Sequence, residues 1–70
     1  MAPPKGVLRI VNGNAMLYNL GNQVIRRYWM KGGATRVDWF DQKESVQIQL
    51  DNGDVVIINI ACQEIKRINS

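Results

Sequence analysis

Residues 46–58 read VQIQLDNGDVVII, and this stretch decides the fold class. Apolar and polar side chains alternate along its first five residues, which is the period-two pattern of a β-strand with one buried face. Asn52-Gly53 separates that strand from a second apolar run, and such a pair indicates a hairpin with a two-residue type I′ turn. The turn predicts a register in which Ile48 lies opposite Ile57.

An internal repeat extends this pattern over most of the chain. A shift of forty positions aligns Asn12-Gly13 with Asn52-Gly53, and six identities fall within residues 10–28 without a gap. The repeat units are residues 7–28 and 46–68, and each predicts a hairpin followed by a third strand. We therefore expect a duplicated antiparallel meander.

Strands and turns account for nearly the whole chain. The first hairpin predicts Leu8 opposite Leu17, and a second turn is expected at Gly21-Asn22 in one unit and at Ala61-Cys62 in the other. A further β-rich run joins the two units. The sequence therefore predicts one all-β domain over residues 1–70, a small antiparallel sheet protein of about seven strands with an internal repeat.

The chain is short for a protein that folds alone. Seventy residues bury only a modest fraction of the surface that the unfolded chain exposes, so a disulfide, a metal or a partner chain commonly adds stability. One cysteine cannot form a disulfide within the chain, and a chain without histidine lacks the commonest metal ligand. Association with other copies remains, and we expect a homo-oligomer.

The middle strand of each hairpin is apolar on both faces, which an ordinary one-sided sheet does not require. A chain of this length has too little material to cover both faces of both strands, so we expect one set of side chains to form an interface between copies. The candidate interface residues are Met16, Tyr18 and Leu20 in the first unit and Val56, Ile58 and Ile60 in the second.

Charge is distributed unevenly along the chain. The net charge is +3, yet residues 1–35 contain no acid and all six acids lie in residues 36–70. Such asymmetry suits either complementary surfaces that attract each other in an assembly or a basic surface for a polyanion. Bases interleaved with aromatics are typical of a surface for single-stranded nucleic acid, although the same rings are also needed for the core. The candidate residues for that surface are Arg26, Arg27, Tyr28, Trp29, Lys31 and Arg36, with Arg9 and Tyr18 able to extend it.

The sequence offers little for catalysis. General bases and metal ligands are scarce, because there is no histidine and Cys62 is the only thiol, a residue that most often packs inside a protein. Asp38, Asp41 and Glu44 form the only acidic cluster, and their spacing lacks the periodicity and the glycine of a calcium loop. We therefore expect a protein that is not an enzyme and that holds neither a metal nor a cofactor.

A unit of about forty residues with four strands is typical of a β-propeller blade. Residues 34–68 have this length and strand pattern, and residues 7–28 match the last three strands of another such unit. The chain resembles WD-repeat-type β-propellers in this respect, without a Gly-His pair and with Asn59-Ile60 and Asn19-Leu20 at the Trp-Asp positions. The resemblance implies blade-like sheets that several chains complete into a ring. A monomeric SH3-like or OB-like barrel is the alternative architecture.

No run of the sequence reaches the roughly 18 apolar residues of a membrane span, and no apolar stretch behind the N-terminus resembles a signal peptide. The single thiol favours a reducing compartment, so we expect a cytoplasmic protein without a membrane partner. The sequence favours a non-enzymatic structural or interaction module that self-associates through apolar sheet faces and presents a surface to a protein partner. The alternative is a small basic β-barrel that binds nucleic acid.

Overall fold

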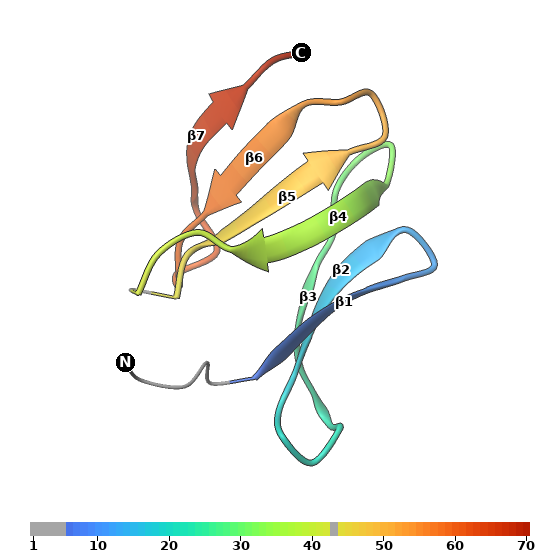
Figure 1. Cartoon of the computed structure of the whole chain (residues 1–70), viewed down its shortest axis with the longest axis vertical. Coiled ribbons are helices and arrows are strands. Elements are labelled where there is room, and N and C mark those ends of the chain that lie inside the picture. The colour runs from blue at the N-terminus through green and yellow to red at the C-terminus, as the bar shows by residue number, and fades with distance from the viewer. Residues whose placement is uncertain (1–5, 43) are drawn as a thin grey trace.

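The computed structural model describes residues 6–42 and 44–70. These residues form seven strands and no helix, so the expected all-β fold class is confirmed (Figure 1). The strands are β1 (Val7–Val11), β2 (Asn14–Tyr18), β3 (Val24–Tyr28), β4 (Ala34–Trp39), β5 (Val46–Leu50), β6 (Val55–Ile58) and β7 (Glu64–Ile68). They form two separate antiparallel sheets, ordered β1-β2-β3 and β4-β5-β6-β7. Each sheet is a meander in which consecutive strands are neighbours.

The turn between β1 and β2 is the two-residue type I′ turn that the sequence predicts. Asn12 and Gly13 both have a positive φ, at 50° and 79°. Asparagine and glycine suit these positions because they tolerate the left-handed conformation better than other residues do. Leu8 lies opposite Leu17, so the register predicted for this hairpin is confirmed.

The turn between β5 and β6 contains one residue more, and the register predicted for it is wrong. Ile48 lies opposite Val56, whereas its predicted partner was Ile57. The Gly53 N–H donates to the Leu50 carbonyl at 3.0 Å, and Gly53 is the residue of this loop with a positive φ, at 93°. These features define a three-residue loop, in which a type I turn is followed by a left-handed glycine. An Asn-Gly pair fits either loop, so the dipeptide alone did not distinguish them.

The β2–β3 and β6–β7 loops have the same geometry. In residues 19–23 and 59–63, the side-chain oxygen of the first asparagine accepts backbone N–H bonds from the residues two and four positions later, at 2.9–3.0 Å. The fourth residue of each loop is left-handed, Asn22 at 65° and Cys62 at 64°. The Cys62 thiol is exposed, so the expectation that it packs inside the protein was wrong.

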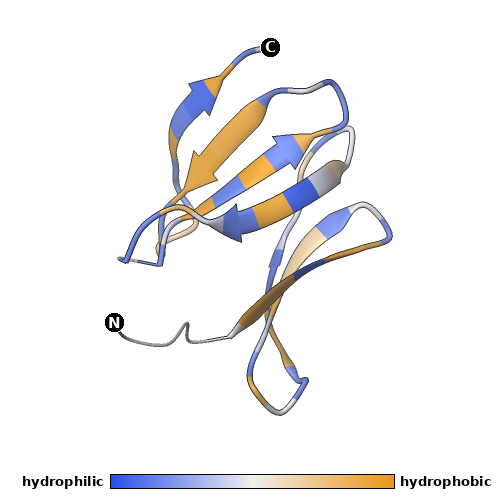
Figure 2. Cartoon of the chain, in the orientation of Figure 1, coloured by the Kyte–Doolittle hydropathy of each residue, from blue (hydrophilic) through white to orange (hydrophobic). Residues whose placement is uncertain are grey.

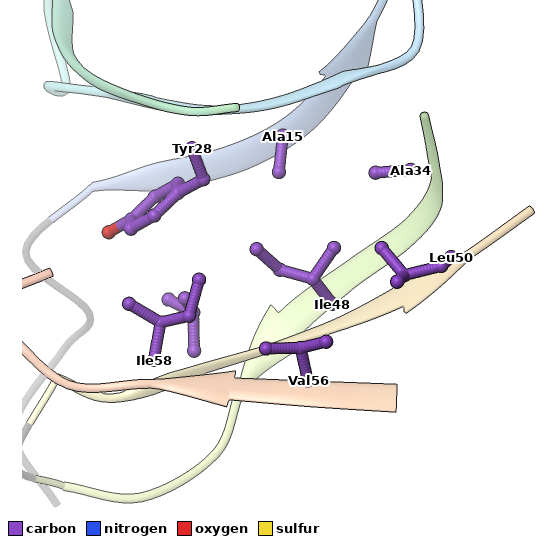
Figure 3. Packing of buried hydrophobic residues seen from close by; sticks show 8 residues of the cluster. Ala15, Tyr28, Ala34, Ile48, Leu50, Val56 and Ile58 are labelled. Carbon is purple, nitrogen blue, oxygen red and sulfur yellow. The ribbon is translucent and has the colours of Figure 1, made fainter. Parts of the chain in front are cut away.

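The core lies between the two sheets (Figure 3). Its buried members are Ala15 and Tyr28 from the three-stranded sheet and Ala34, Val46, Ile48, Leu50, Val56 and Ile58 from the four-stranded sheet. Tyr28 and Ala15 point toward Ile48 and Ile58 across the space between the sheets. Complete burial of a side chain such as Ile48 contributes about 1.5–3 kcal/mol to folding, so this layer is the main source of stability.

Hydropathy along the strands follows this arrangement (Figure 2). β6 is apolar along its whole length, and its last three residues are buried. β5 alternates, with Ile48 in the core and Gln47 exposed. β7 is the edge strand beside β6, and all five of its residues are exposed. The four-stranded sheet therefore has a well-covered centre and an open edge.

Polar contacts also join the sheets. The Ala34 N–H, at the start of β4, donates to the Gly13 carbonyl in the β1–β2 turn at 2.7 Å. The Arg26 guanidinium on β3 donates to the Ile60 carbonyl in the β6–β7 loop at 2.7 Å. β4 lies against both β1 and β2. These contacts hold the sheets face to face and leave the opposite face of each sheet pointing outward.

Candidate interaction surface

Strand alternation places one face of the three-stranded sheet outside the core. Ala15 and Leu17 of β2 pack toward the four-stranded sheet, so Met16 and Tyr18 point the other way. Their cross-strand partners share that side, because residues directly opposite each other point to the same face. We call this surface the β1–β3 outer face, and it includes Val7, Arg9, Val11, Met16, Tyr18, Val24 and Arg27.

The β1–β3 outer face is both apolar and basic. Met16 lies between two arginines, opposite Arg9 on β1 and Arg27 on β3. The Arg9 guanidinium carbon lies over the Tyr18 ring, 5.2 Å from its centroid, which is a cation–π contact. Residues 6–35 contain no acid, so no carboxylate of this sheet neutralises the arginines. The exposed valines of the face are Val7, Val11 and Val24, at 38%, 37% and 55%.

The outward face of the four-stranded sheet is more polar. Ile48 and Val56 point into the core, so Gln47, Gln49 and their cross-strand partners point away from it. We call this surface the β4–β7 outer face, and it includes Arg36, Asp38, Gln47, Gln49, Val55, Ile57, Lys66 and Ile68. Ile57 is 2% exposed although strand alternation directs it to this side. An open groove of about 300 Å³ is lined by Arg36, Val37, Asp38, Gln47, Gln49 and Val55.

The candidate interface residues form two apolar stripes, one on β2 and one on β6, and the two stripes have different surroundings. Met16 and Tyr18 lie on the β1–β3 outer face. Val56 and Ile58 belong to the core, at 0% and 5% exposure, because the three-stranded sheet packs over them. The second stripe is thus covered by the other sheet. In the first stripe Met16 is also only 7% exposed, so the partly exposed Tyr18 is the member left for an interface.

Leu20 and Ile60 do not lie on the strand faces to which they were assigned. β2 ends at Tyr18 and β6 ends at Ile58, so both residues fall within the loops that follow. Leu20 is 80% exposed and Ile60 is 53% exposed. Their placement on the stripes was wrong because the asparagine-capped loops begin earlier than the apolar pattern indicated.

Strand alternation also divides the residues expected to bind nucleic acid. Arg27 is exposed on the β1–β3 outer face, whereas its neighbours Arg26 and Tyr28 point toward the other sheet. Tyr28 is 4% exposed, and burial raises the pKa of its phenol above 10.0 although the nearby Arg26 charge acts to lower it. A base cannot stack on this ring, so the expected surface loses one of its two consecutive aromatics.

The remaining residues of that set are spread over the molecule. Trp29 follows β3 directly and is 69% exposed. Lys31 is exposed in the loop before β4, and Arg36 lies on the β4–β7 outer face. The six residues therefore do not form one surface. Arg27 shares its face with Arg9 and Tyr18, which the basic-aromatic pattern had included as an extension.

Sequence reasoning missed the valines of the β1–β3 outer face and the groove on the opposite sheet. The valines could have been found, because the type I′ register places Val7 opposite Tyr18 and therefore on the same face. The groove could not, since the predicted β5–β6 register put Gln47 opposite Ile58 and not opposite Ile57.

Several carboxylates of the second half are engaged within the chain. Asp54 and Glu64 form ion pairs with Arg67, at 3.5 and 3.2 Å. The Asp41 carboxylate accepts a hydrogen bond from the Ser45 N–H at 3.1 Å. Across residues 6–42 and 44–70, no group of three His, Cys, Asp or Glu side chains could hold a metal ion. That same part of the chain includes no helix long and apolar enough to cross a membrane.

Comparisons with models of protein families, with curated proteins and with solved structures found no match. The two outer faces and their charges are therefore the basis for assigning a function.

Proposed function

We propose that this protein is a non-enzymatic interaction module that self-associates through its sheet faces and presents a surface to a protein partner. The β1–β3 outer face carries the proposal, because Tyr18 is partly exposed there beside the partly exposed Val7, Val11 and Val24. Met16, on the same face, is 7% exposed. Within the described residues, the second sheet covers only the opposite side of this sheet. Contiguous apolar surface rimmed by polar residues is typical of a protein-binding site.

The residue types on this face suit an interface. Tyrosine, arginine and methionine are enriched at protein–protein contacts, and tyrosine and arginine often contribute most of the binding energy. Arg9 and Tyr18 already contact each other, so less side-chain entropy is lost when a partner covers them. A chain of seventy residues also gains stability when a partner buries more of its apolar surface.

Two further features are consistent with this proposal. The strands of each sheet follow one another in sequence order, as in the blade-like sheets that the sequence resembles. Cys62 is a free, exposed thiol, which suits the reducing conditions of the cytoplasm, the compartment that we propose.

The native mass of the protein tests self-association. By native mass spectrometry and light scattering, we expect the wild-type protein to exceed the 8.0 kDa of one chain. Tyr18→Lys should shift the protein toward single chains, because a desolvated ammonium opposes docking. Leu20→Lys is the matched control, since it adds the same charge in a loop two residues later. The proposal would be excluded if the wild-type protein stays monomeric at a concentration about 100-fold above a micromolar dissociation constant.

Binding of single-stranded nucleic acid is a second candidate function. It is favoured by the row of Arg9, Met16 and Arg27 beside Tyr18, on a sheet without acids. Basic side chains beside an aromatic ring can contact phosphates while a base stacks on the ring.

Fluorescence anisotropy with a labelled single-stranded oligonucleotide tests this candidate. Arg9→Ala and Arg27→Ala should each weaken binding and reduce the dependence of log K on log salt by about 0.7. Arg36→Ala removes the same charge from the other sheet and should leave binding nearly unchanged. Equal losses in all three variants would indicate a diffuse charge effect and exclude a site on this face.

A further inference from the structure

The two sheets share most of their strand geometry. In β2–β3, Met16 lies opposite Arg27 and a bulge follows Leu17. In β6–β7, the residues forty positions later repeat both features, with Val56 opposite Arg67 and a bulge after Ile57. The loops between these strands are also alike, as described above. The β2–β3 and β6–β7 hairpins are thus equivalent pairs of strands.

Equivalent strands present opposite faces to the core. Met16 and Tyr18 point outward, whereas the equivalent residues Val56 and Ile58 point inward. The first strands agree with this relation once the longer β5–β6 loop is taken into account. Leu8 of β1 lies opposite Leu17, and Gln47 of β5 lies opposite Ile57. The β1–β3 outer face is therefore equivalent to the inner face of β5–β7.

This relation means that the sheets stack in the same sense, with the back of one sheet on the front of the next. Inside the chain, the inner face of β1–β3 packs on the inner face of β5–β7, and these two faces are not equivalent to each other. The two outward faces therefore also differ in kind: the β1–β3 outer face corresponds to the inner face of β5–β7, and the β4–β7 outer face corresponds to the inner face of β1–β3. We propose that a second copy of this chain docks head to tail, its β4–β7 outer face covering the β1–β3 outer face. This inference rests on the self-association proposed above and specifies its geometry.

Side chains on the two outer faces fit this contact. Val55 and Ile57 stand where Ala15 and Leu17 stand in the internal packing, so apolar residues occupy the same positions. Ile57 is 2% exposed, and the partly exposed Val55 is the one that a second copy can contact directly. The more polar positions are also matched. Arg9 lies opposite Met16 as Ile48 lies opposite Val56, so Arg9 occupies the position of Ile48, a residue that packs in the core. Arg9 would then face the groove over β4 and β5 of the partner.

Polar groups in that groove can receive a guanidinium. Gln47 and Gln49 supply amide oxygens, and Asp38 supplies the one carboxylate of the β4–β7 outer face. A planar guanidinium with five N–H donors suits a cluster of such acceptors. The same face also carries Arg36 and Lys66, so the attraction comes from hydrogen bonds and Asp38 and not from the net charge of the face.

Two-fold docking of the β1–β3 outer face on itself is the less favourable arrangement. It would bring Arg9 and Arg27 of both copies into one interface, and the sheet has no acid to pair with them. Like charges that are desolvated together destabilise an interface. A head-to-tail contact also brings Arg36 and Lys66 of the partner to this face, but it adds the Asp38 carboxylate and the amide oxygens of Gln47 and Gln49, which two-fold docking lacks. A head-to-tail dimer leaves one β1–β3 outer face and one β4–β7 outer face uncovered. Further copies therefore add until a ring closes or a filament grows.

Mixing two blocked variants tests this geometry. Tyr18→Lys blocks the β1–β3 outer face and leaves the other face intact, whereas Gln49→Lys blocks the β4–β7 outer face. Each variant alone should associate about tenfold more weakly than wild type, or worse. An equimolar mixture should form a dimer and nothing larger, because one intact face of each kind remains. Circular dichroism establishes that both variants keep the fold, and Leu20→Lys serves as the matched control.

The outcomes separate this inference from the proposed function. A capped dimer that forms only in the mixture supports head-to-tail docking. Wild-type oligomers that resist Gln49→Lys and yield to Tyr18→Lys indicate two-fold docking, which overturns this inference and leaves self-association standing. Oligomers that resist both variants overturn the inference as well, because neither outer face is then involved. A monomeric wild-type protein overturns both proposals.

Discussion

The two Asn-Gly hairpins contain the same dipeptide and differ by one residue in the loop. Between β1 and β2, Asn12 and Gly13 are both left-handed and form a two-residue turn. Between β5 and β6, only Gly53 is left-handed, and residues 51–53 form a three-residue loop. Because side chains alternate along a strand, one extra residue exchanges the two faces of the strand that follows.

This difference decides which apolar face becomes the core. Leu8 and Ile48 are forty positions apart, and both pack toward the centre. Met16 and Val56 are also forty positions apart, yet only Val56 belongs to the core cluster. The extra residue lies between these pairs in the sequence. Because of this residue, β1 and β5 bury side chains at positions that are forty residues apart, whereas β2 and β6 bury opposite faces.

The largest expected effect comes from placing lysine at equivalent positions of β2 and β6. Ile58→Lys should destabilise the protein by about 3 kcal/mol or more, because it buries an unpaired ammonium in the core. Tyr18→Lys should cost less than about 1 kcal/mol in a single chain, because this residue lies on an outer face. Urea denaturation followed by circular dichroism measures both changes. Equal losses in the two variants would contradict the assignment of the outer face.

Valine at the two turn glycines should have the next largest effect. Gly13→Val and Gly53→Val should each lower stability by about 2 kcal/mol, because a β-branched residue is strained at a positive φ. A side chain at Gly53 would also come within 3.2 Å of Ser70, whereas the nearest atom to one at Gly13 is 3.9 Å away. Thermal melts should therefore show a larger loss for Gly53→Ala than for Gly13→Ala. Equal losses, or the reverse order, would contradict a cost of crowding at Ser70.

The sequence predicted the number and order of the strands well, because Asn-Gly pairs and period-two patterns are local signals. It predicted Leu8 opposite Leu17 correctly and Ile48 opposite Ile57 incorrectly, since the choice between a two-residue and a three-residue loop depends on packing. Which stripe of each middle strand is buried depends on how two sheets stack, a property of no single segment. The outer surface was therefore predicted only in part, through Met16 and Tyr18.

Cys62 offers a way to improve one loop by copying the other. It is left-handed at 64°, and Asn22 holds the equivalent position in the β2–β3 loop at 65°. Asparagine tolerates this conformation better than cysteine does, so Cys62→Asn should stabilise the protein by about 1 kcal/mol. Asn22→Cys, the reverse exchange, should destabilise it by a similar amount. Chemical denaturation measures the change in the free energy of unfolding for both variants. Changes of opposite sign would establish that the two loops are equivalent, and a loss of stability in both variants would contradict this equivalence.

Glycine at the two turn asparagines should give a smaller and more selective effect. Asn12→Gly should be neutral within about 0.5 kcal/mol, because glycine is favourable in a left-handed turn position. Asn52→Gly should cost about 1 kcal/mol, because it removes the side-chain oxygen that accepts the Asp54 N–H at 2.9 Å. The difference between the two variants reports loop length directly. Similar values in urea denaturation would indicate that both loops adopt the same turn.

The smallest effect concerns an acid present in one turn and absent from the other. Asp54 follows the second Asn-Gly pair, whereas Asn14 follows the first. The Ser70 N–H donates to the Asp54 carboxylate at 3.0 Å, and this bond lowers the pKa of Asp54 below 3.8, with smaller contributions from Asn52 and Arg67.

A folded-state pKa below the unfolded value means that the folded protein binds this proton less readily. The contribution of Asp54 to stability is therefore present above pH 3.8 and is lost as the pH falls through the lowered pKa. Asp54→Asn should reduce stability at neutral pH and flatten the decline between pH 5 and pH 2, roughly the range in which carboxylates protonate. Asp51→Asn, at an exposed position of the same loop, is the matched control. If both variants decline as steeply as wild type, the contact between Asp54 and the Ser70 N–H contributes nothing to folding.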